Sequence, residues 1–426
     1  MTRAQSSLLR HAVACGAAAL SCLSPRAAAA DDEAARLPQY VLSFESAVPL
    51  FDMRTGRADV RGRSVRTNAL AAGVGEGLPR AYDAPLRRGF DWHPRGTSLT
   101  VGAGLSASSI GLYEPPRCNC EVWDQSGSYL HGQLRVGTLS RDGNMVVWPR
   151  AGLAYSSFEL RDGTRSTHGH QVALTAEVGV YYAVSDAAAI GVRGSGRFPV
   201  HASGDTRDGE GPVVADTRGF GAGAAVDLLV GLDGITRARG GPTHRPTWLL
   251  ELDRTAPLIA YRFDLGASDD RRPPLALGTP MPWDIDHLAA PRFALHRLLG
   301  RFTLGLGAGG WVARRETELA VIRESLAAAS AHVGVLTPIP ILEKVYFWPR
   351  AVASVLALEG GQGETRRARE AWVGVEPALA YFLHPSILIA LGVSSDLRLV
   401  RDSDGPPRRE PMTVRLGSSF RVALAF

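Results

Sequence analysis

Apolar and polar residues alternate along long stretches of this chain, and the carboxyl-terminal segment VRLGSSFRVALAF shows the pattern most clearly. Arginine, glycine, serine and alanine occupy one set of alternate positions there. The other set is apolar and comprises Val414, Leu416, Phe420, Val422, Leu424 and Phe426. A period of two predicts a β-strand with one apolar face.

The same alternation predicts sixteen strands. In the first half of the sequence they fall at 40–51, 86–93, 98–112, 129–139, 145–160, 169–184, 187–200 and 215–232. In the second half they fall at 248–262, 291–298, 301–313, 330–337, 345–359, 370–384, 386–400 and 412–426. Short turns and longer polar loops strictly alternate between them, as in barrels with short periplasmic turns and longer external loops.

The chain also repeats itself. The tetrapeptide Trp-Pro-Arg-Ala begins at Trp148 and again at Trp348, and other segments match in the same order at offsets that drift from 208 to 194. We therefore expect two diverged copies, each an eight-stranded unit, with boundaries at 31–232 and 248–426. The segment 233–247 would then be a periplasmic linker.

The amino-terminal end has the features of an export signal. Arg3 and Arg10 precede an apolar run from Ala12 to Leu23, and small residues follow up to Ala30. This order predicts a cleavable signal peptide at 1–30. The run is too short to span a bilayer. Export would place Cys118 and Cys120 in an oxidising compartment, where they either form a local disulfide or remain a loop feature.

Alternating strands, an export signal and a terminal Phe426 resemble bacterial outer-membrane β-barrel proteins, whose last strand typically ends in an aromatic assembly signal. The resemblance covers the mature chain and implies an all-β transmembrane antiparallel barrel in the outer membrane. We expect sixteen strands in a single barrel, with two tandem eight-stranded barrels as the alternative. The resemblance also implies contact with outer-membrane lipids and lipopolysaccharide, and folding by the barrel assembly machinery.

The strand pattern assigns side chains to the two faces of the expected barrel. Aromatic residues near the short turns predict a girdle at the membrane interface, made of Trp92, Trp148, Tyr182, Trp348 and Tyr381. Charged residues on the opposite faces predict a charged lumen, with Arg150 near Glu177 and Arg350 near Glu376 as one ion pair in each copy. The other expected lumenal charges are Glu45, Asp91, Arg135, Arg193, Arg197, Asp253, Asp396 and Arg398.

Little in the sequence indicates catalysis. There is no Gly-x-Ser-x-Gly elbow and no His-Glu-x-x-His motif, and the His168-Gly-His170 segment alone does not define a metal site. We predict no cofactor, no metal, no nucleic-acid partner and no enzyme activity. Two loops differ from ordinary turns: 52–85 is rich in arginine that can contact lipopolysaccharide phosphates, and 314–329 has the apolar spacing of a short helix.

The leading functional expectation is a porin-like channel for passive diffusion of small solutes. The alternatives are a non-conducting barrel with a structural or surface-contact role and, third, a lipid-modifying barrel enzyme. The oligomeric state does not follow from the sequence.

Overall fold

The computed structural model consists of β-strands joined by turns and loops. It describes residues 38–60, 63–74, 87–114, 123–162, 165–185, 187–208, 211–214, 218–233, 246–265, 275–278, 292–317, 321–340, 342, 345–362, 366–403 and 412–426. Cys118, Cys120 and the predicted signal peptide lie outside these residues. No helix among the described residues is long and apolar enough to cross a membrane.

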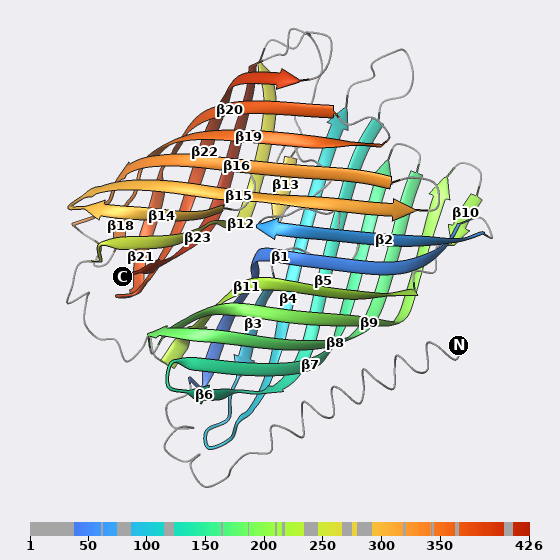
Figure 1. Cartoon of the computed structure of the whole chain (residues 1–426), viewed down its shortest axis with the longest axis horizontal. Helices are drawn as coiled ribbons and strands as arrows, with labels where there is room; N and C mark the ends of the chain where they lie inside the picture. The colour runs from blue at the N-terminus through green and yellow to red at the C-terminus, as the bar shows by residue number, and fades with distance from the viewer. Residues whose placement is uncertain are drawn as a thin grey trace.

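Eight strands of the first half of the chain close on themselves (Figure 1). Each pairs antiparallel with the next, and the last pairs with the first, so the ladder has no free end at the short-turn side. We call this set the first ring. Its strands are β1 (Tyr40–Val60), β3 (Arg87–Trp92), β4 (Leu99–Glu114), β5 (Trp123–Thr138), β7 (Met145–Asp162), β8 (Arg165–Ser185), β9 (Ala188–Asp208) and β11 (Arg218–Gly231).

The remaining strands close in the same way and form the second ring. Its strands are β12 (Trp248–Leu265), β14 (Arg292–Leu299), β15 (Phe302–Thr317), β16 (Val321–Val335), β19 (Arg350–Gln362), β20 (Arg366–Glu376), β22 (Ile387–Ser403) and β23 (Met412–Ala425). β21 (Ala378–His384) continues β20 and also pairs with β22. Short strands β6 (Ser140–Asp142), β17 (Thr337–Pro338) and β18 (Val345–Phe347) lie at the short turns.

These closures do not confirm a single barrel of sixteen strands. One such barrel needs β1 paired with β23 and β11 with β12, whereas β1 pairs with β11 and β12 with β23. The expected alternative of two eight-stranded units agrees with the pairings. The physical reason is that each half carries enough strands to satisfy its own edges at the short-turn side.

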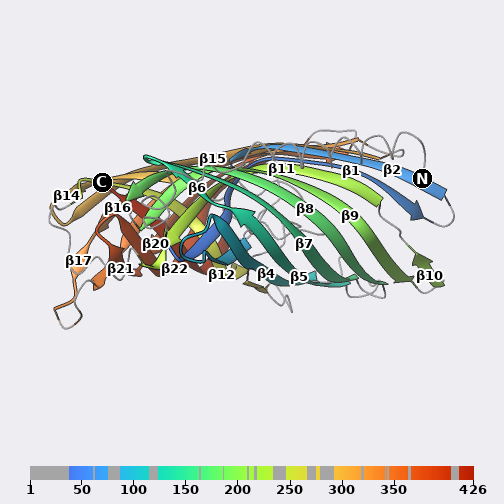
Figure 2. The same cartoon turned by 90° about the horizontal axis from the view of Figure 1, so that it is seen from below.

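Two further ladders join the rings at the long-loop side. β2 (Arg63–Val74) pairs with β1 and with β15, while β13 (Leu275–Gly278) pairs with β12 and with β4. A small strand, β10 (Gly211–Val214), pairs with β9. Figure 2 shows the strands of both rings within one flattened body. The prediction of a loop at 52–85 is therefore wrong for the described part of this segment. That part extends β1 and forms β2.

The prediction of a helix at 314–329 is also wrong. Residues up to Thr317 belong to β15 and those from Val321 belong to β16. Leu326 and Ala328 are buried while Ala327 between them is exposed, which is the period of a strand. The helical spacing of the apolar residues in this segment was coincidental.

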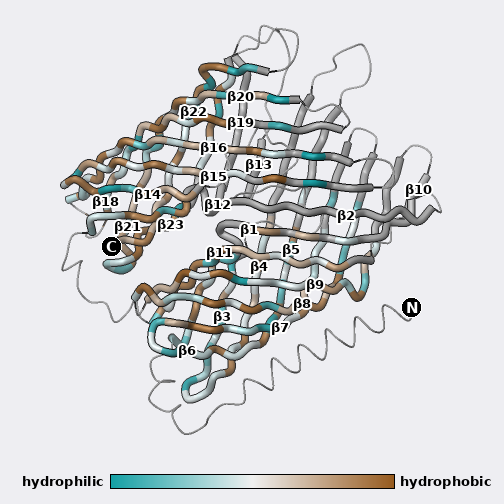
Figure 3. Tube along the Cα trace, viewed as in Figure 1, coloured by the Kyte–Doolittle hydropathy of each residue, from teal (hydrophilic) through white to brown (hydrophobic). Residues whose placement is uncertain are grey.

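Alternation along the strands separates two faces. In β8 the residues Gln171, Ala173, Thr175 and Glu177 are buried, and Leu174 and the apolar positions that alternate with them are exposed. Exposed Leu, Val and Phe side chains lie on most of the ring strands. Apolar positions, drawn in brown, are frequent along the coloured short-turn parts of both rings (Figure 3). An apolar exterior around a polar interior is the arrangement of a barrel surrounded by lipid.

The rings also pack against each other through outward-facing apolar side chains. Phe44, Leu228 and Val230 of the first ring form one buried cluster with residues of the second ring. Those residues are Leu252, Ile387, Val422 and Leu424. The contact removes apolar surface from both exteriors and fixes the rings side by side.

Candidate functional site: a charged layer inside each ring

The repeated tetrapeptide places a tryptophan and an arginine inside each ring. Trp148 and Trp348 are fully buried, and each indole Nε1–H donates to a threonine hydroxyl, Thr100 at 3.0 Å and Thr303 at 3.1 Å. Because residues two apart in a strand share a face, the arginine that follows lies on the same side. The guanidinium of Arg150 lies 4.4 Å from the Trp148 ring centre. In the second ring the corresponding distance, from Arg350 to Trp348, is 4.7 Å.

This burial corrects the predicted aromatic girdle. Trp148 and Trp348 cannot lie at a lipid interface, because their rings fill the interior and their N–H groups are satisfied there. Trp92 and Tyr182 are exposed, by 43% and 52%, and Tyr381 is half-buried on an outward position. An expected aromatic belt thus keeps three of its five members on the outer face.

The first ring holds seven buried charges in one connected layer. The layer comprises four carboxylates and three guanidinium groups: Glu45, Asp91, Glu177, Asp227, Arg135, Arg150 and Arg193. Glu45 lies at its centre, where Arg135 and Arg150 both donate to it and Arg193 lies 4.0 Å away. We call these seven residues the first charged layer.

Every arginine of the first charged layer bridges two or more carboxylates. Arg150 lies directly opposite Glu177 in the ladder, and their side chains are 3.0 Å apart. Arg135 pairs with Asp91 as well as with Glu45. Arg193 contacts Glu177 at 3.2 Å and Asp227 at 2.6 Å.

The second charged layer is built on the same frame with fewer charges. Arg350 contacts Glu251 and Glu376, both at 2.5 Å, and Arg421 contacts Glu376 at 3.1 Å. His296 places Nε2 2.7 Å from the Glu251 carboxylate, and its ring centre lies 5.2 Å from that of His332, the sixth member of the layer. The predicted pair of Arg350 and Glu376 is again directly opposite in the ladder.

In the second ring, two histidines occupy the positions that an acid and a base occupy in the first ring. Asp91 and Arg135 both lie opposite Gly102, whereas His296 and His332 both lie opposite Gly305. A Cβ at Gly102 would come within 2.0 Å of the Asp91 carboxylate, and a Cβ at Gly305 within 2.2 Å of the His296 ring. Glycine at this point of each ring makes room for the side chain beside it.

The remaining predicted lumenal residues have varied positions. Arg197 is half-buried and donates to the Ser156 hydroxyl at 2.7 Å. Asp396 and Arg398 are buried toward the long-loop side of the second ring. The side chain of Asp253 lies outside the described part of the structure, and Glu251, two residues earlier, occupies the layer instead. Phe426 is exposed, and its carbonyl accepts bonds from the amides of Thr247 and Trp248 at the closing seam.

The predictions missed several members of these layers, notably Asp227, Glu251, His296, His332 and Arg421. Their alternation was visible in the sequence, since Asp227 and Arg421 each fall on the polar positions of a predicted strand. His168 and His170, by contrast, are exposed on the outer face of β8. Within the described ranges, no group of three or more His, Cys, Asp or Glu residues is arranged to hold a metal ion.

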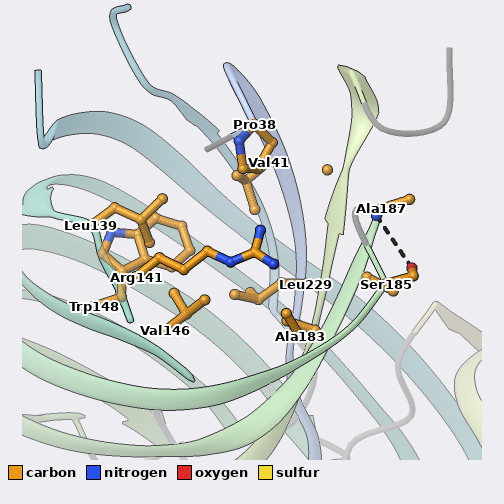
Figure 4. A pocket seen from close by; sticks show the side chains of 13 residues that line it. Pro38, Val41, Leu139, Arg141, Val146, Trp148, Ala183, Ser185, Ala187 and Leu229 are labelled. Carbon is orange, nitrogen blue, oxygen red and sulfur yellow. Dashed lines mark hydrogen bonds between the residues drawn. The ribbon is translucent and has the colours of Figure 1, made fainter. Parts of the chain in front are cut away.

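On the short-turn side of each charged layer the interior is apolar. The first ring has a cluster that includes Val41, Leu139, Tyr181 and Leu229, and the second has one that includes Leu249 and Phe382. In the first ring this region contains a small cavity of about 40 Å³, which lies among Pro38, Val41, Arg141, Val146 and Trp148 (Figure 4).

Closed antiparallel rings with apolar exteriors and charged interiors define the class of this protein, a β-barrel of the bacterial outer-membrane type. No protein-family model and no curated protein matches the chain. Among solved structures, it is similar to Neisserial surface protein A with 11% identity and a TM-score of 0.23, over 45% of this chain and 97% of the other. It is similar to the β domain of the Bordetella autotransporter BrkA with 10% identity and a TM-score of 0.29, over 76% and 99%. For the Pseudomonas putida toluene transporter TodX the values are 10% and 0.27, over 91% and 88%.

Proposed function

We propose that the protein is an outer-membrane channel for passive diffusion of small solutes, held closed by its charged layers. The lumen of the first ring is polar on the long-loop side, with His131, Gln133 and Thr175 buried there. On the short-turn side a small cavity lies beside Trp148. The first charged layer lies between these two regions.

The observation that carries the proposal is the number of charges buried across so narrow a lumen. Removing charges from water is expensive, and well-packed apolar side chains often fill the same space at lower cost. A purely structural core would therefore not need seven of them. Ion pairs that share partners have a different use, because they exchange partners by side-chain rotation.

Glu45 shows how such an exchange would open a path. It already lies within 4.0 Å of three arginines, so a small rotation trades one contact for another. An eight-stranded ring is just wide enough for its own side chains to fill. Only water, ions and small solutes would therefore pass.

The second candidate is a barrel that does not conduct. Its support is the full burial of Trp148 and Trp348 next to the charged layers, in both rings. Each indole is held by a hydrogen bond and blocks the lumen. In that case the protein serves membrane integrity or surface contact.

Planar-bilayer recordings of the refolded protein test the two candidates. The channel predicts brief, small conductance steps, and Glu45→Gln should lengthen the open time at least about ten-fold, because three arginines would lose their shared carboxylate. Glu359→Gln, on an exposed side chain outside the ring, is the matched control and should record as wild type. Silence from folded wild-type protein and folded Glu45→Gln alike would overturn the channel and leave the non-conducting barrel.

The surroundings of the protein follow the same proposal. We expect it to lie in the outer membrane, exported by a signal peptide and inserted by the barrel assembly machinery, with lipopolysaccharide around its long-loop side. We propose no catalytic step. A lipid A profile that changes when the gene is deleted would favour the lipid-modifying alternative.

A further inference from the structure

The outer face of the second ring carries exposed arginines where its apolar surface ends toward the long-loop side. They are Arg323 on β16 and Arg367 and Arg369 on β20, and we call them the arginine border. We propose that the arginine border binds the phosphate group of a membrane lipid whose acyl chains lie on the apolar surface beside it. This goes beyond the channel, because a lipid bound on the outside of the ring needs no conduction.

The outward residues of β20 and β21 change from apolar to charged at one point. Leu379, Val375 and Val373 are exposed along the outer face, which continues toward the long loops with Arg369 and then Arg367. A strand rises about 3.4 Å per residue and is tilted by about 40° in a membrane barrel, so the interval from Leu379 to Arg369 (379 − 369 = 10) covers about 25 Å across the membrane. The apolar band of such a barrel is about equally tall. Arg369 therefore lies where the lipid headgroups begin.

The two strands before β20 show the same change on their outer faces. On β16 the outward residues from Ala331 to Ala327 are exposed alanines, and Arg323 is the first outward charge after them. On β19, which pairs with both β16 and β20, the outward residues are apolar up to Ala357, and Glu359 comes next. Charges thus begin near the long-loop ends of three adjacent strands, directly beside a surface suited to acyl chains.

The side chains of Arg323 and Arg369 are available to a ligand. Within the part of the chain that the structure describes, neither takes part in an ion pair or a hydrogen bond, although Asp402 lies opposite Arg369 in the ladder. Arg314 lies opposite Arg323 on β15 and has a partner of its own, so we do not include it in the arginine border. Two exposed guanidinium groups therefore keep their N–H donors for a partner outside the protein.

The third arginine has a weak partner. Arg367 contacts Glu359 at 3.3 Å, and the two side chains are 66% and 45% exposed. Exposed pairs of this kind contribute little, so a phosphate can compete for Arg367. A guanidinium group matches two phosphate oxygens, and basic residues at a membrane surface attract anionic headgroups. Because the arginines stand next to lipid-facing side chains, we commit to a lipid phosphate and not to a free anion.

The first ring has histidines at two of these positions. Counted back from the glutamate of each charged layer, His170 corresponds to Arg369 (177 − 170 = 7 and 376 − 369 = 7), and His168 corresponds to Arg367. Both histidines are exposed on the outer face of β8. An imidazole is not a permanent cation, whereas a guanidinium is. The arginine border is thus an addition to the second ring and no requirement of an eight-stranded ring.

Native mass spectrometry of refolded, detergent-solubilised protein tests the site, with phosphatidic acid and phosphatidylcholine of the same acyl chains as probes. Wild-type protein should bind phosphatidic acid at least about ten-fold more tightly, because only its phosphate is not covered by choline. In the double variant Arg323→Gln, Arg369→Gln this preference should fall at least about five-fold, since charge-assisted bonds are lost. Glu359→Gln should raise the preference about two-fold, because Arg367 loses its competing partner.

Two control variants are matched to the site. Arg301→Gln removes an exposed arginine at a short turn of the same ring, and His168→Gln, His170→Gln changes the corresponding positions of the first ring. Both should keep the wild-type preference at about pH 8, where histidine is generally neutral. Equal affinity for the two lipids in wild-type protein whose folding is verified by circular dichroism would overturn the proposal. So would an equal loss in Arg301→Gln and the double arginine variant, which would mean attraction to the net charge alone. None of these measurements requires current, so they stand apart from the test of the channel.

Discussion

In the first ring, Trp148 and Arg150 stand beside an aspartate and an arginine, Asp91 and Arg135. In the second ring, Trp348 and Arg350 stand beside two histidines, His296 and His332. The frame of tryptophan, threonine, arginine and glutamate is the same in both. The partners around this frame differ, because the first ring has an acid and a base where the second ring has two histidines.

A second difference changes the net charge. The first ring has Arg193 on β9 and Asp227 on β11, whereas the second has Gly392 and Arg421 at the matching ladder positions. Arg193 and Asp227 together carry no net charge, whereas Gly392 and Arg421 together carry one positive charge, and Arg421 contacts Glu376. The comparison teaches that the charged layers tolerate a change of net charge as long as each arginine keeps a carboxylate partner.

The largest effect should come from removing the arginine of the smaller layer. Arg350→Ala leaves Glu251 and Glu376 with Arg421 as their remaining arginine in the second charged layer, and we expect a loss of about 5 kcal/mol in the free energy of unfolding. Arg150→Ala should cost less, about 3 kcal/mol, because Arg135 and Arg193 still contact its carboxylates. Urea unfolding in lipid vesicles measures both. Equal losses would mean that the two layers are not organised as we describe.

Removing a charge pair should restore part of that loss. Arg150→Ala together with Glu177→Ala takes one cation and one anion from the first charged layer, so fewer unpaired charges remain than after Arg150→Ala alone. We expect the double variant to unfold at a higher urea concentration than the single one. Identical midpoints would argue against a direct pairing of Arg150 with Glu177.

Transferring the acid and base between rings is the next sharpest test. His332→Arg or His296→Asp alone unbalances the second charged layer and should destabilise it by about 2 kcal/mol, whereas the double variant recreates the pair of the first ring. The coupling energy between the two substitutions should therefore be favourable and at least about 1 kcal/mol. Additive effects would show that the positions do not correspond.

The threonine acceptors should give a smaller, matched effect. Thr100→Val and Thr303→Val keep the shape of the side chain and remove the acceptor of the buried indole N–H, which costs about 1–2 kcal/mol. Because the two bonds are alike in length and burial, the losses should agree within about 0.5 kcal/mol. A clear difference in melting temperature between the variants would break the equivalence of the two rings at this point.

The smallest effect concerns a turn outside the strands. His93 follows β3 and is buried; burial lowers the pKa of its imidazole, and backbone bonds to Thr97 and Pro38 offset this in part. The unfolded chain therefore takes up the proton at a higher pH, so stability is lost as the pH falls from about 6.5 through the folded pKa. In His93→Gln, the midpoint of unfolding should depend less on pH over this range. An unchanged slope would show that His93 is not the cause.

Much of the fold could be predicted because a period of two is a strong signal. All sixteen expected strand positions hold a strand of one of the rings. The expected alternation of short and long connections is not general, because β7 ends at Asp162 and β8 begins at Arg165, where the sequence predicted a long loop. Closure could not be predicted, since the alternation of β1 is the same whether its partner is β11 or β23. The extension of β1 and the addition of β2 were missed because this arginine-rich segment looks like a solvated loop.

The candidate site was predicted where charge and alternation agreed, as for Arg150 with Glu177. It failed at Glu251, which follows Leu249 by two residues as Ser43 follows Val41, whereas the sequence alignment paired Glu45 with Asp253. The carboxylate of the second layer thus comes from a position that holds a serine in the first ring. Trp148 and Trp348 were misplaced for a different reason. A tryptophan near a short turn can lie in a lipid belt or fill the lumen. The hydrogen-bond partner of its N–H shows which of the two positions it takes.

Cysteine cross-linking of the closing seams tests the central claim of two separately closed rings most directly. Ser43 lies opposite Leu229 in the first ring and Leu249 opposite Ala425 in the second, all buried and within the span of a disulfide. In a background without the four natural cysteines, Ser43→Cys with Leu229→Cys and Leu249→Cys with Ala425→Cys should each form a disulfide, detected by mass spectrometry. Ser43→Cys with Ala425→Cys should stay reduced. Formation of that third bond in place of the first would show that β1 pairs with β23, in one barrel, and would contradict the account.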